Sequence, residues 1–291
     1  MAKEIRRIAL SLALLVSATM VFAQHQLNSL DIQVILNKNG DARISEIREM
    51  VIDSTGSECS IGLGDMSPST VKDLIVSDET GESYEYVGAW EKDRSRSEKE
   101  GRCGIVKKDD GGIELCWGIG ESGRRTFVTS YTITGLVRGY SDADAICHVF
   151  LDKSATPKPE WARVTLVSAD TTVVFTPETC GLYSSRFKGG LYFVKGAMVA
   201  MTTEPMNAEA ALQIMAKFPK GKFKPTIQVS DDTFDHKKQL ALEGKDFSEA
   251  VKEKKSVGQI LLTILKVLGI IAAVTAVLGG LYYLFKKSKK K

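Results

Sequence analysis

The chain has 291 residues, of which 43% are hydrophobic and 26% are charged, and its formal net charge is +3. The basic excess belongs to the two ends, where a basic start and a lysine-rich tail flank a mildly acidic middle. Because binding to phosphate backbones needs clustered positive charge, this balance argues against nucleic acid as a partner.

Residues 1–23 have the pattern of a secretory signal peptide. Basic side chains lie among the first seven positions, and an apolar run follows from Ile8 to Phe22. Val21 and Ala23 give the small-x-small pattern that signal peptidase recognises, so Gln24 is the expected mature start. An uncleaved N-terminal anchor is the alternative, although the apolar run is short for a full membrane span.

A β-hairpin is expected at the start of the mature chain. Apolar and polar residues alternate from Leu30 to Leu36, which indicates a half-buried strand. Asn39-Gly40 is a strong hairpin turn signal, and a second strand is expected from Ala42 to Ile52. Residues 53–70 are rich in Gly, Ser, Asp and Pro and are expected to form a loop.

Further strands are predicted along most of the remaining chain by the same period of two. They are expected at residues 71–76, 83–90, 125–137, 145–151, 162–167, 171–176, 191–194 and 197–202, with a hairpin over residues 103–117. The charged stretch from Glu91 to Arg102 is expected to be a solvated loop, with anion binding by its arginines as the alternative. Asn207 to Phe218 is ambiguous, because its composition favours a helix while its alternation and context favour a strand.

Five cysteines lie between the two ends of the chain, and an exported protein uses cysteines first as disulfide candidates. An odd count leaves at least one cysteine unpaired within the chain. Cys103 and Cys116 flank the expected turn at residues 109–112, so a disulfide between them is the preferred pairing. The sequence has no CxxC motif and no Cys/His spacing typical of zinc sites, so neither a metal nor another cofactor is expected.

No catalytic constellation is apparent in the sequence. Cys147 and His148 are adjacent, but neighbouring side chains on a strand point to opposite faces, so they are not expected to act together. Asp142 and Asp144 could serve acid–base chemistry or calcium binding, and a turn is the preferred interpretation. The three tryptophans could stack on a sugar, although core packing is their commoner role. We therefore predict no catalytic, cofactor-binding or metal-binding residue and expect that the chain is not an enzyme.

The C-terminal region predicts a membrane anchor. Residues 231–256 are charged and are expected to form a juxtamembrane stalk. Val267 to Phe285 is an uncharged run of nineteen residues, long enough to cross a bilayer as a helix, and Lys266 could snorkel so that the span covers residues 260–285. Lys286, Lys287 and the rest of the tail to residue 291 mark the cytoplasmic side. The tail also fits a K-x-K-x-x retrieval signal, but we favour the positive-inside anchor.

Three segments carry a family resemblance. They are LDIQVILNKNGDARISEI from Leu30, IELCWGIGESGRRTFVTSYTITGLVRGYSDADAICHVF from Ile113, and LQIMAKFPKGKF from Leu212. Together they resemble the N-terminal ectodomain of a bacterial family of membrane proteins catalogued as domain of unknown function 2207, over residues 27–223. The most specific part of the resemblance is the block from Trp117 to Phe150. There the family has an aromatic-rich strand with a tyrosine, here Tyr131, followed by a Tyr-Asp-type turn, here Tyr140 to Asp144.

The resemblance implies a signal peptide, a β-rich extracytoplasmic domain and following membrane spans, and it makes Leu212 to Phe218 a strand. The chain departs from the family in three places. The segment from Cys147 to Phe150 stands where the family usually has a tryptophan, the cysteines are peculiar to this chain, and only one membrane span is expected where family members often have several.

The expected fold is mainly β, an antiparallel β-sandwich-like ectodomain over residues 24–230 with one C-terminal transmembrane helix. The expected localisation is the cell membrane as a single-pass type I protein, with the ectodomain periplasmic or extracellular. The expected function is a binding or interaction module of the bacterial cell envelope, with a protein or envelope component as partner. An extracytoplasmic enzyme with a cryptic site is the alternative.

Overall fold

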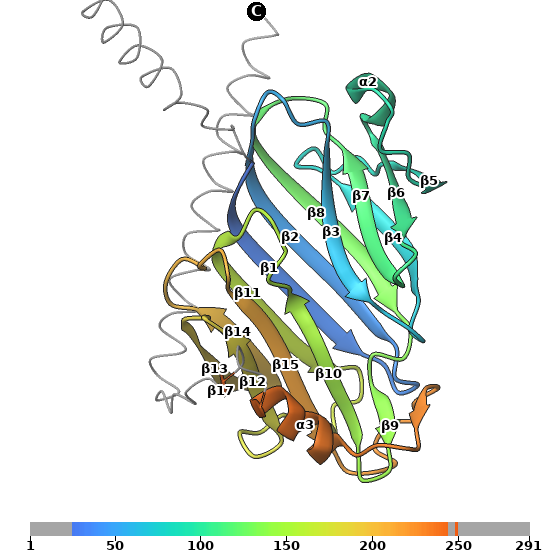
Figure 1. The fold of residues 1–291 in the computed structure, drawn as a ribbon, viewed down its shortest axis with the longest axis vertical. Helices are drawn as coiled ribbons and strands as arrows, with labels where there is room; N and C mark the ends of the chain where they lie inside the picture. Colours follow the sequence, from blue (N-terminus) through green and yellow to red (C-terminus); the bar gives the residue numbers. More distant parts are fainter. Residues whose placement is uncertain (1–24, 244–247, 250–291) are drawn as a thin grey trace, which may run out of the picture.

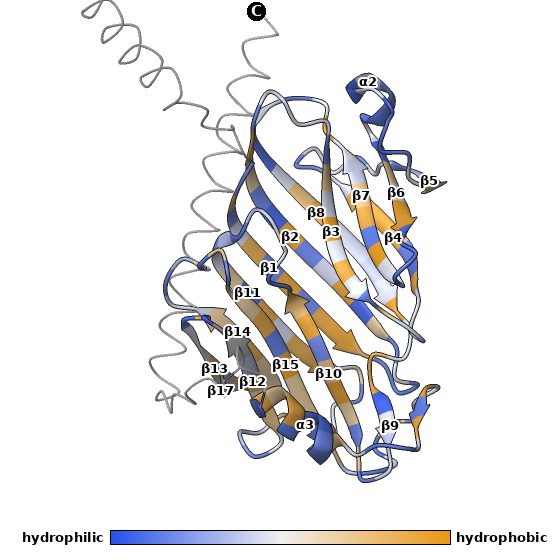
Figure 2. Ribbon diagram, viewed as in Figure 1, coloured by the Kyte–Doolittle hydropathy of each residue, from blue (hydrophilic) through white to orange (hydrophobic). Residues whose placement is uncertain are grey.

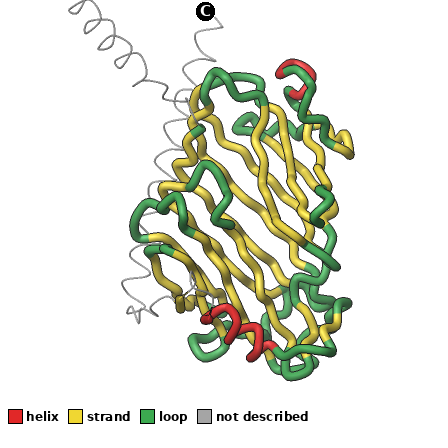
Figure 3. Tube along the Cα trace, viewed as in Figure 1, coloured by secondary structure: helices red, strands yellow, loops and turns green. Residues whose placement is uncertain are grey.

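The computed structural model describes residues 25–243 and 248–249. It is mainly β, as the sequence predicts, with strands in three sheets and two helices in the described part (Figures 1 and 3). The largest sheet has seven strands, and a four-stranded and a six-stranded sheet both cover one of its faces (Figure 1). One continuous cluster of buried apolar side chains joins all three sheets.

The seven-stranded sheet forms one layer of the fold. Its strands are, in spatial order, β13 (Gly189–Val194), β14 (Ala197–Thr202), β11 (Pro159–Ser168), β1 (Gln26–Leu36), β2 (Ala42–Ile52), β8 (Gly123–Ile133) and β4 (Val71–Ser77). Neighbours are antiparallel except β1 and β11, which are parallel. The sheet is therefore mixed and departs at this pair from the expected antiparallel pattern.

The two smaller sheets form the second layer. The four-stranded sheet has the order β3 (Glu58–Asp65), β7 (Gly112–Gly118), β6 (Arg102–Lys107) and β5 (Glu85–Ala89). The six-stranded sheet has the order β16 (Gln228–Val229), β9 (Arg138–Tyr140), β10 (Asp144–Leu151), β15 (Ala211–Phe218), β12 (Cys180–Ser185) and β17 (Ser248–Glu249). The helices are α2 (Arg96–Lys99) and α3 (Phe234–Glu243).

The first hairpin shows how the pattern of the sequence produces the layers. Asn37 donates its backbone N–H to the carbonyl of Asp41, and Gly40 has a φ of 88°, a conformation that glycine adopts without strain. Leu36 pairs with Ala42, so the even-numbered residues from Leu30 to Leu36 and from Ala42 to Ile52 face the core. Figure 2 shows the resulting alternation of apolar and polar residues along β1 and β2.

Tertiary contacts decide the ambiguous segment and correct two others. Residues 211–218 form β15, because β10 and β12 pair with its two edges and override its helical composition. Residues 58–65, expected to be loop, form β3 against β7. Residues 171–176, expected to be a strand, pair with no neighbour among the described residues, since a turn from Asp170 to Val173 folds them back.

The predicted disulfide between Cys103 and Cys116 is absent, and both are free thiols. The expected hairpin does form, but its register places Cys103 opposite Trp117 and Cys116 opposite Gly104. The two cysteines are therefore one pairing position out of step, and their side chains point to opposite faces of the sheet. This register, which the sequence does not reveal, makes the prediction wrong in this structure.

The charged loop after β5 is more ordered than expected. Ser95 donates both its backbone N–H and its hydroxyl to the Glu98 carboxylate at the start of α2, as in a capping box. Lys99, which follows, is only 3% exposed and its Nζ lies 2.8 Å from Oε2 of Glu58. Residues 91–102 thus cover the outer face of the four-stranded sheet, instead of being solvated throughout.

The expected stalk begins too early at residue 231. Phe234 starts α3, is only 4% exposed, and packs its ring 6.3 Å from the ring of Tyr140. Its backbone N–H donates to Asp142 at 2.8 Å, so α3 belongs to the folded domain. In the described part of the chain, no helix has the length and apolar character that crossing a bilayer requires. The predicted signal peptide, transmembrane span and lysine tail lie outside the described residues.

Candidate functional site

The two smaller sheets leave a groove between them. Its walls are β3, which pairs only with β7, and the part of β10 beyond Ala145, where β9 no longer pairs with it. No backbone hydrogen bond links β3 to β10 in the described part of the chain. Each wall is therefore a strand edge with backbone N–H and C=O groups directed into the groove.

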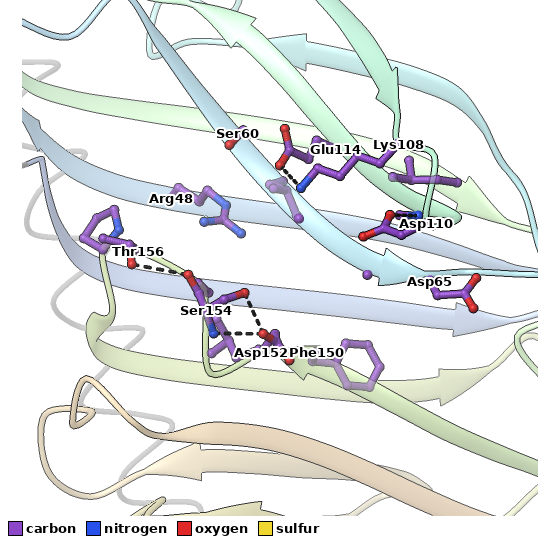
Figure 4. Close-up of a pocket in the computed structure, with 18 residues that line it drawn as sticks. Arg48, Ser60, Asp65, Lys108, Asp110, Glu114, Phe150, Asp152, Ser154 and Thr156 are labelled. Carbon is purple, nitrogen blue, oxygen red and sulfur yellow. Dashed lines mark hydrogen bonds and ion pairs between the residues drawn. The ribbon is translucent and has the colours of Figure 1, made fainter.

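Two adjoining cavities occupy this groove. One has a volume of about 360 Å³ and reaches from Arg48 on β2 to the loop at Ser154 (Figure 4). The other has a volume of about 340 Å³ and reaches toward His148. They share lining residues on both walls, among them Gly62 of β3 and Asp152 after β10. We name their combined volume the β3–β10 groove.

The floor of the groove carries a buried polar network. Arg48 is 9% exposed and Glu46 is 2% exposed, and Arg48 donates through Nε and Nη2 to Oε2 of Glu46 at 3.1 and 2.7 Å. Tyr131 of β8 donates its hydroxyl to the other oxygen of Glu46. Burial, together with the Glu46 charge and hydrogen bond, raises the pKa of Tyr131 well above its ordinary value, so it stays a donor.

One nitrogen of this network is left for a ligand. The Nη1 atom of Arg48 has no hydrogen-bond partner among the described residues, and Arg48 lines the larger cavity. Figure 4 shows its guanidinium in the space between β3 and the loop after β10. A guanidinium with a vacant donor in a partly dehydrated cavity is suited to bind a carboxylate.

The rim beside β3 is acidic. Glu114 is paired with Lys108 and Lys92, whose hydrogen bonds lower the pKa of its carboxyl against the opposing effect of burial. Asp65 and Asp110 differ, because neither forms an ion pair within the described ranges. Each accepts a backbone N–H of its own turn with Oδ1 and leaves Oδ2 without a partner there. They present unpaired negative charge at one end of the groove (Figure 4).

Glycines keep the β3 wall open. A Cβ placed on Gly62 or on Gly64 would meet no heavy atom within 4 Å. Gly64 has a φ of 66° and is at the position where the register of β3 shifts against β7. A bulge here bends the strand edge away from its partner and widens the space before β10.

The opposite end of the groove holds the pair of reactive residues noted in the sequence. His148 faces the groove with its ring 4.7 Å from that of Phe150, and burial, with a smaller contribution from Arg138, lowers its pKa to about 4. The Cys147 thiol packs with the cluster under α3, on the other face, and accepts a hydrogen bond from Gln213. Burial raises the pKa of Cys147, and the two side chains do not converge, as the alternation predicts.

The other candidates from the sequence have structural contacts. Asp144 is 1% exposed and accepts the N–H of Phe223, while Asp142 accepts that of Phe234, so both tie loops to the sheet. Trp117 is fully buried beside Phe127, and Trp90 donates to Glu58. In the described part of the chain, no group of three His, Cys, Asp or Glu side chains is arranged to hold a metal.

Sequence reasoning missed the groove. The one available signal is on β2, where Glu46 and Arg48 occupy inward-facing positions between Ile44 and Met50. Charged residues on the core face of a strand indicate either a buried pair or an uncovered part of the sheet, and here both hold. The second wall could not be predicted, because β3 was expected to be loop.

No family model matches the chain, and no curated protein matches it. The resemblance to domain of unknown function 2207 therefore stays a prediction. Among solved structures, the chain is similar over 67% of its length to a candidate protease from Parabacteroides distasonis, with 14% identity, a TM-score of 0.37 and 40% of that chain covered.

Two further structures show the same level of likeness. Leukotriene A4 hydrolase from Saccharomyces cerevisiae matches over 68% of this chain and 30% of its own, with 8% identity and a TM-score of 0.36. An M1 zinc metallopeptidase from Deinococcus radiodurans matches over 67% and 42%, with 13% identity and a TM-score of 0.32. The chain thus spans less than half the length of these proteins, and values this low carry no argument about its activity.

Proposed function

We propose that this chain is a membrane-anchored extracytoplasmic β-domain whose work is binding, and that the β3–β10 groove is its ligand site. The signal peptide and the run from Val267 to Phe285 in the sequence support the topology. The binding takes place outside the membrane, with a protein or envelope component as partner.

The observation that carries this proposal is the groove itself. Strand edges are normally paired, covered or blocked, because exposed ones recruit other chains. Here two edges face one space, above a floor where Arg48 is nine-tenths buried and its Nη1 has no hydrogen-bond partner among residues 25–243 and 248–249. Glu46, Arg48 and Tyr131 on this floor offer charge and hydrogen bonds to a ligand, but they are not arranged as a catalytic set. This favours a binding module over the enzyme alternative.

Site-specific photo-crosslinking of the full-length chain in its native membrane tests the proposal. A photoreactive amino acid at Ser60, an exposed position that lines the larger cavity, is expected to give one discrete adduct. The matched control places the same amino acid at Glu85, an exposed position on β5 at the opposite edge of the same sheet. Equal labelling at both positions, or no adduct at Ser60, would refute a ligand site in the groove.

A further inference from the structure

Resting on this proposed function, we infer that the groove takes an extended peptide segment of a partner protein, inserted as an additional strand between β3 and β10. The inserted segment carries an acidic side chain that binds Arg48 and a basic side chain that binds Asp65 and Asp110.

A free backbone edge of β3 and a free backbone edge of β10 both line the groove. On one side the free edge of β3 covers Ser60 to Gly64, and on the other the free edge of β10 covers Ile146 to Phe150. Adjacent strands lie about 4.8 Å apart, so a strand inserted between these edges holds them about 10 Å apart. β3 and β10 run in opposite directions (Figure 1), so an inserted strand is parallel to one and antiparallel to the other. It would join the two small sheets into one continuous layer.

The charges of the groove differ in depth and in position along the groove (Figure 4). Arg48 lies on the floor, where Nη1 has no partner in the described ranges. Asp65 and Asp110 are exposed at the rim, with no ion pair in the described ranges. A ligand with one charge of each sign satisfies both regions, whereas a uniformly acidic or basic segment is repelled by one of them. The dehydrated floor makes the Arg48 contact the stronger of the two.

The depth of each charge in the groove restricts the sequence spacing between the two charged residues of the ligand. Successive side chains of a strand point to opposite faces, so the acidic side chain toward the floor and the basic side chain toward the rim are separated by an odd number of positions. A segment with adjacent Glu and Lys meets this condition. A segment of the same composition with the two charges two positions apart does not, because both side chains then point to the same face.

Binding of blocked hexapeptides to the full-length chain tests the inference. The probe is acetyl-Thr-Val-Glu-Lys-Val-Thr-amide, used up to about 1 mM because short segments bind weakly. Its two comparison peptides are acetyl-Thr-Glu-Val-Lys-Val-Thr-amide, with both charges on one face, and the probe with both valines N-methylated. Amide hydrogen exchange of the protein reports which backbone groups the peptide covers.

Insertion of a strand predicts a result that surface binding would not give. The probe is expected to slow exchange on both walls at once, over residues 60–64 and 146–150, while β5 at the far edge is unchanged. Each comparison peptide is expected to bind at least about tenfold more weakly, since one loses an ion pair and the other loses two backbone donors. Protection of one wall alone, or equal binding of all three peptides, would overturn strand insertion.

Substitutions at the rim of the groove test the charge contact while leaving the fold unchanged. Asp65→Asn with Asp110→Asn keeps both turns, because Asn can also accept their backbone N–H groups, and is expected to weaken the probe about tenfold. Asp109→Asn, an exposed neighbour that lines neither cavity, is the matched control and is expected to change nothing. Equal affinity of the double variant and the control would overturn the assigned rim contact.

The groove can also be filled from the β3 wall. Gly62→Trp is expected to abolish probe binding without unfolding the domain, because Gly62 has open space around its Cβ position and needs no positive φ. Glu85→Trp, on the opposite edge of the sheet, is its control. If the photoreactive amino acid at position 60 forms its adduct in the membrane but the hexapeptide probe does not bind, strand insertion is wrong and the binding function stands. If both fail, both proposals are wrong.

Discussion

Glu46 and Arg48 occupy inward positions of a strand whose other inward side chains are apolar. A buried ion pair is stabilising only while both partners are present, since the dehydration of each charge opposes folding. The Tyr131 hydroxyl donates to the second carboxylate oxygen, and within the described part of the chain Nη1 of Arg48 is left without a hydrogen-bond partner. This combination ties the stability of the central sheet to the same residues that face the proposed ligand.

Glu46→Ala is expected to lower the free energy of unfolding by about 3–5 kcal/mol, because it leaves the Arg48 charge buried without its partner. Tyr131→Phe is expected to cost less, about 1–2 kcal/mol, because it removes one hydrogen bond and keeps the ion pair. Urea unfolding of each variant provides the measurement. Arg43→Ala, an exposed change on the same strand, is the control and should stay within about 0.5 kcal/mol. Equal costs for Glu46→Ala and Tyr131→Phe would contradict the buried-charge explanation.

The half-buried His148 side chain predicts a dependence of stability on pH. Its pKa in the folded state is about 4, against 6.5 for the free side chain, so the unfolded chain binds the extra proton between these values. Stability from this residue is complete above about pH 6.5 and is lost as the pH falls toward 4. We expect a loss of about 2 kcal/mol over that range, measured from urea unfolding midpoints at pH 7 and at pH 4.5.

Comparison with His148→Gln isolates this contribution, because acidic groups titrate in both proteins. The difference in unfolding free energy between wild type and His148→Gln should shrink or reverse as the pH falls. His236→Gln, at an exposed histidine on α3, should behave as wild type at both pH values. A difference between wild type and His148→Gln that does not change with pH would show that the ring is not held neutral.

At the scale of elements, periodicity predicted the first hairpin and most of the seven-stranded sheet, because each of those strands has one buried and one exposed face. It failed for β3, where Gly62 and Gly64 interrupt the apolar pattern. It also failed for residues 171–176, where Val173 and Phe175 are buried by a turn that mimics the pattern of a strand. The groove was unpredictable for the same reason, since its wall depends on β3 and on the register of β10.

The two glycines of β3 allow a matched test of the bulge. Both have open space around the Cβ position, but only Gly64 has a positive φ, of 66°. Gly64→Ala is therefore expected to destabilise the protein by about 1–2 kcal/mol through backbone strain. Gly62→Ala should be neutral or slightly stabilising. Thermal or urea unfolding of the two variants decides the point, and equal effects would mean that the bulge does not depend on the left-handed backbone.

At the scale of the whole molecule, Cys59, Cys103 and Cys180 are buried in the core between the two layers, and Cys116 is buried on the other face of the four-stranded sheet. Burial raises the pKa of Cys59 and Cys116 to about 12 and that of Cys103 to about 11. The reactive thiolate form is therefore very sparse near neutral pH. Since Cys103 and Cys116 face opposite sides of their sheet, the fold protects these thiols by burial instead of by a bridge between them.

Alkylation of the folded full-length chain at pH 8 tests this arrangement. Cys59, Cys103 and Cys116 are expected to react at least about 100-fold more slowly than an exposed thiol, because both access and the thiolate fraction are reduced. Ser60→Cys supplies that exposed thiol one position from Cys59, and peptide mapping by mass spectrometry measures each rate. In denaturant without reductant, Cys103 and Cys116 should both become alkylated. A linked pair of their peptides, two daltons lighter than the sum of the two free peptides, would show that the Cys103–Cys116 disulfide forms. That disulfide would require a shifted register of β6 against β7, and Glu114 and the acidic rim would move with it.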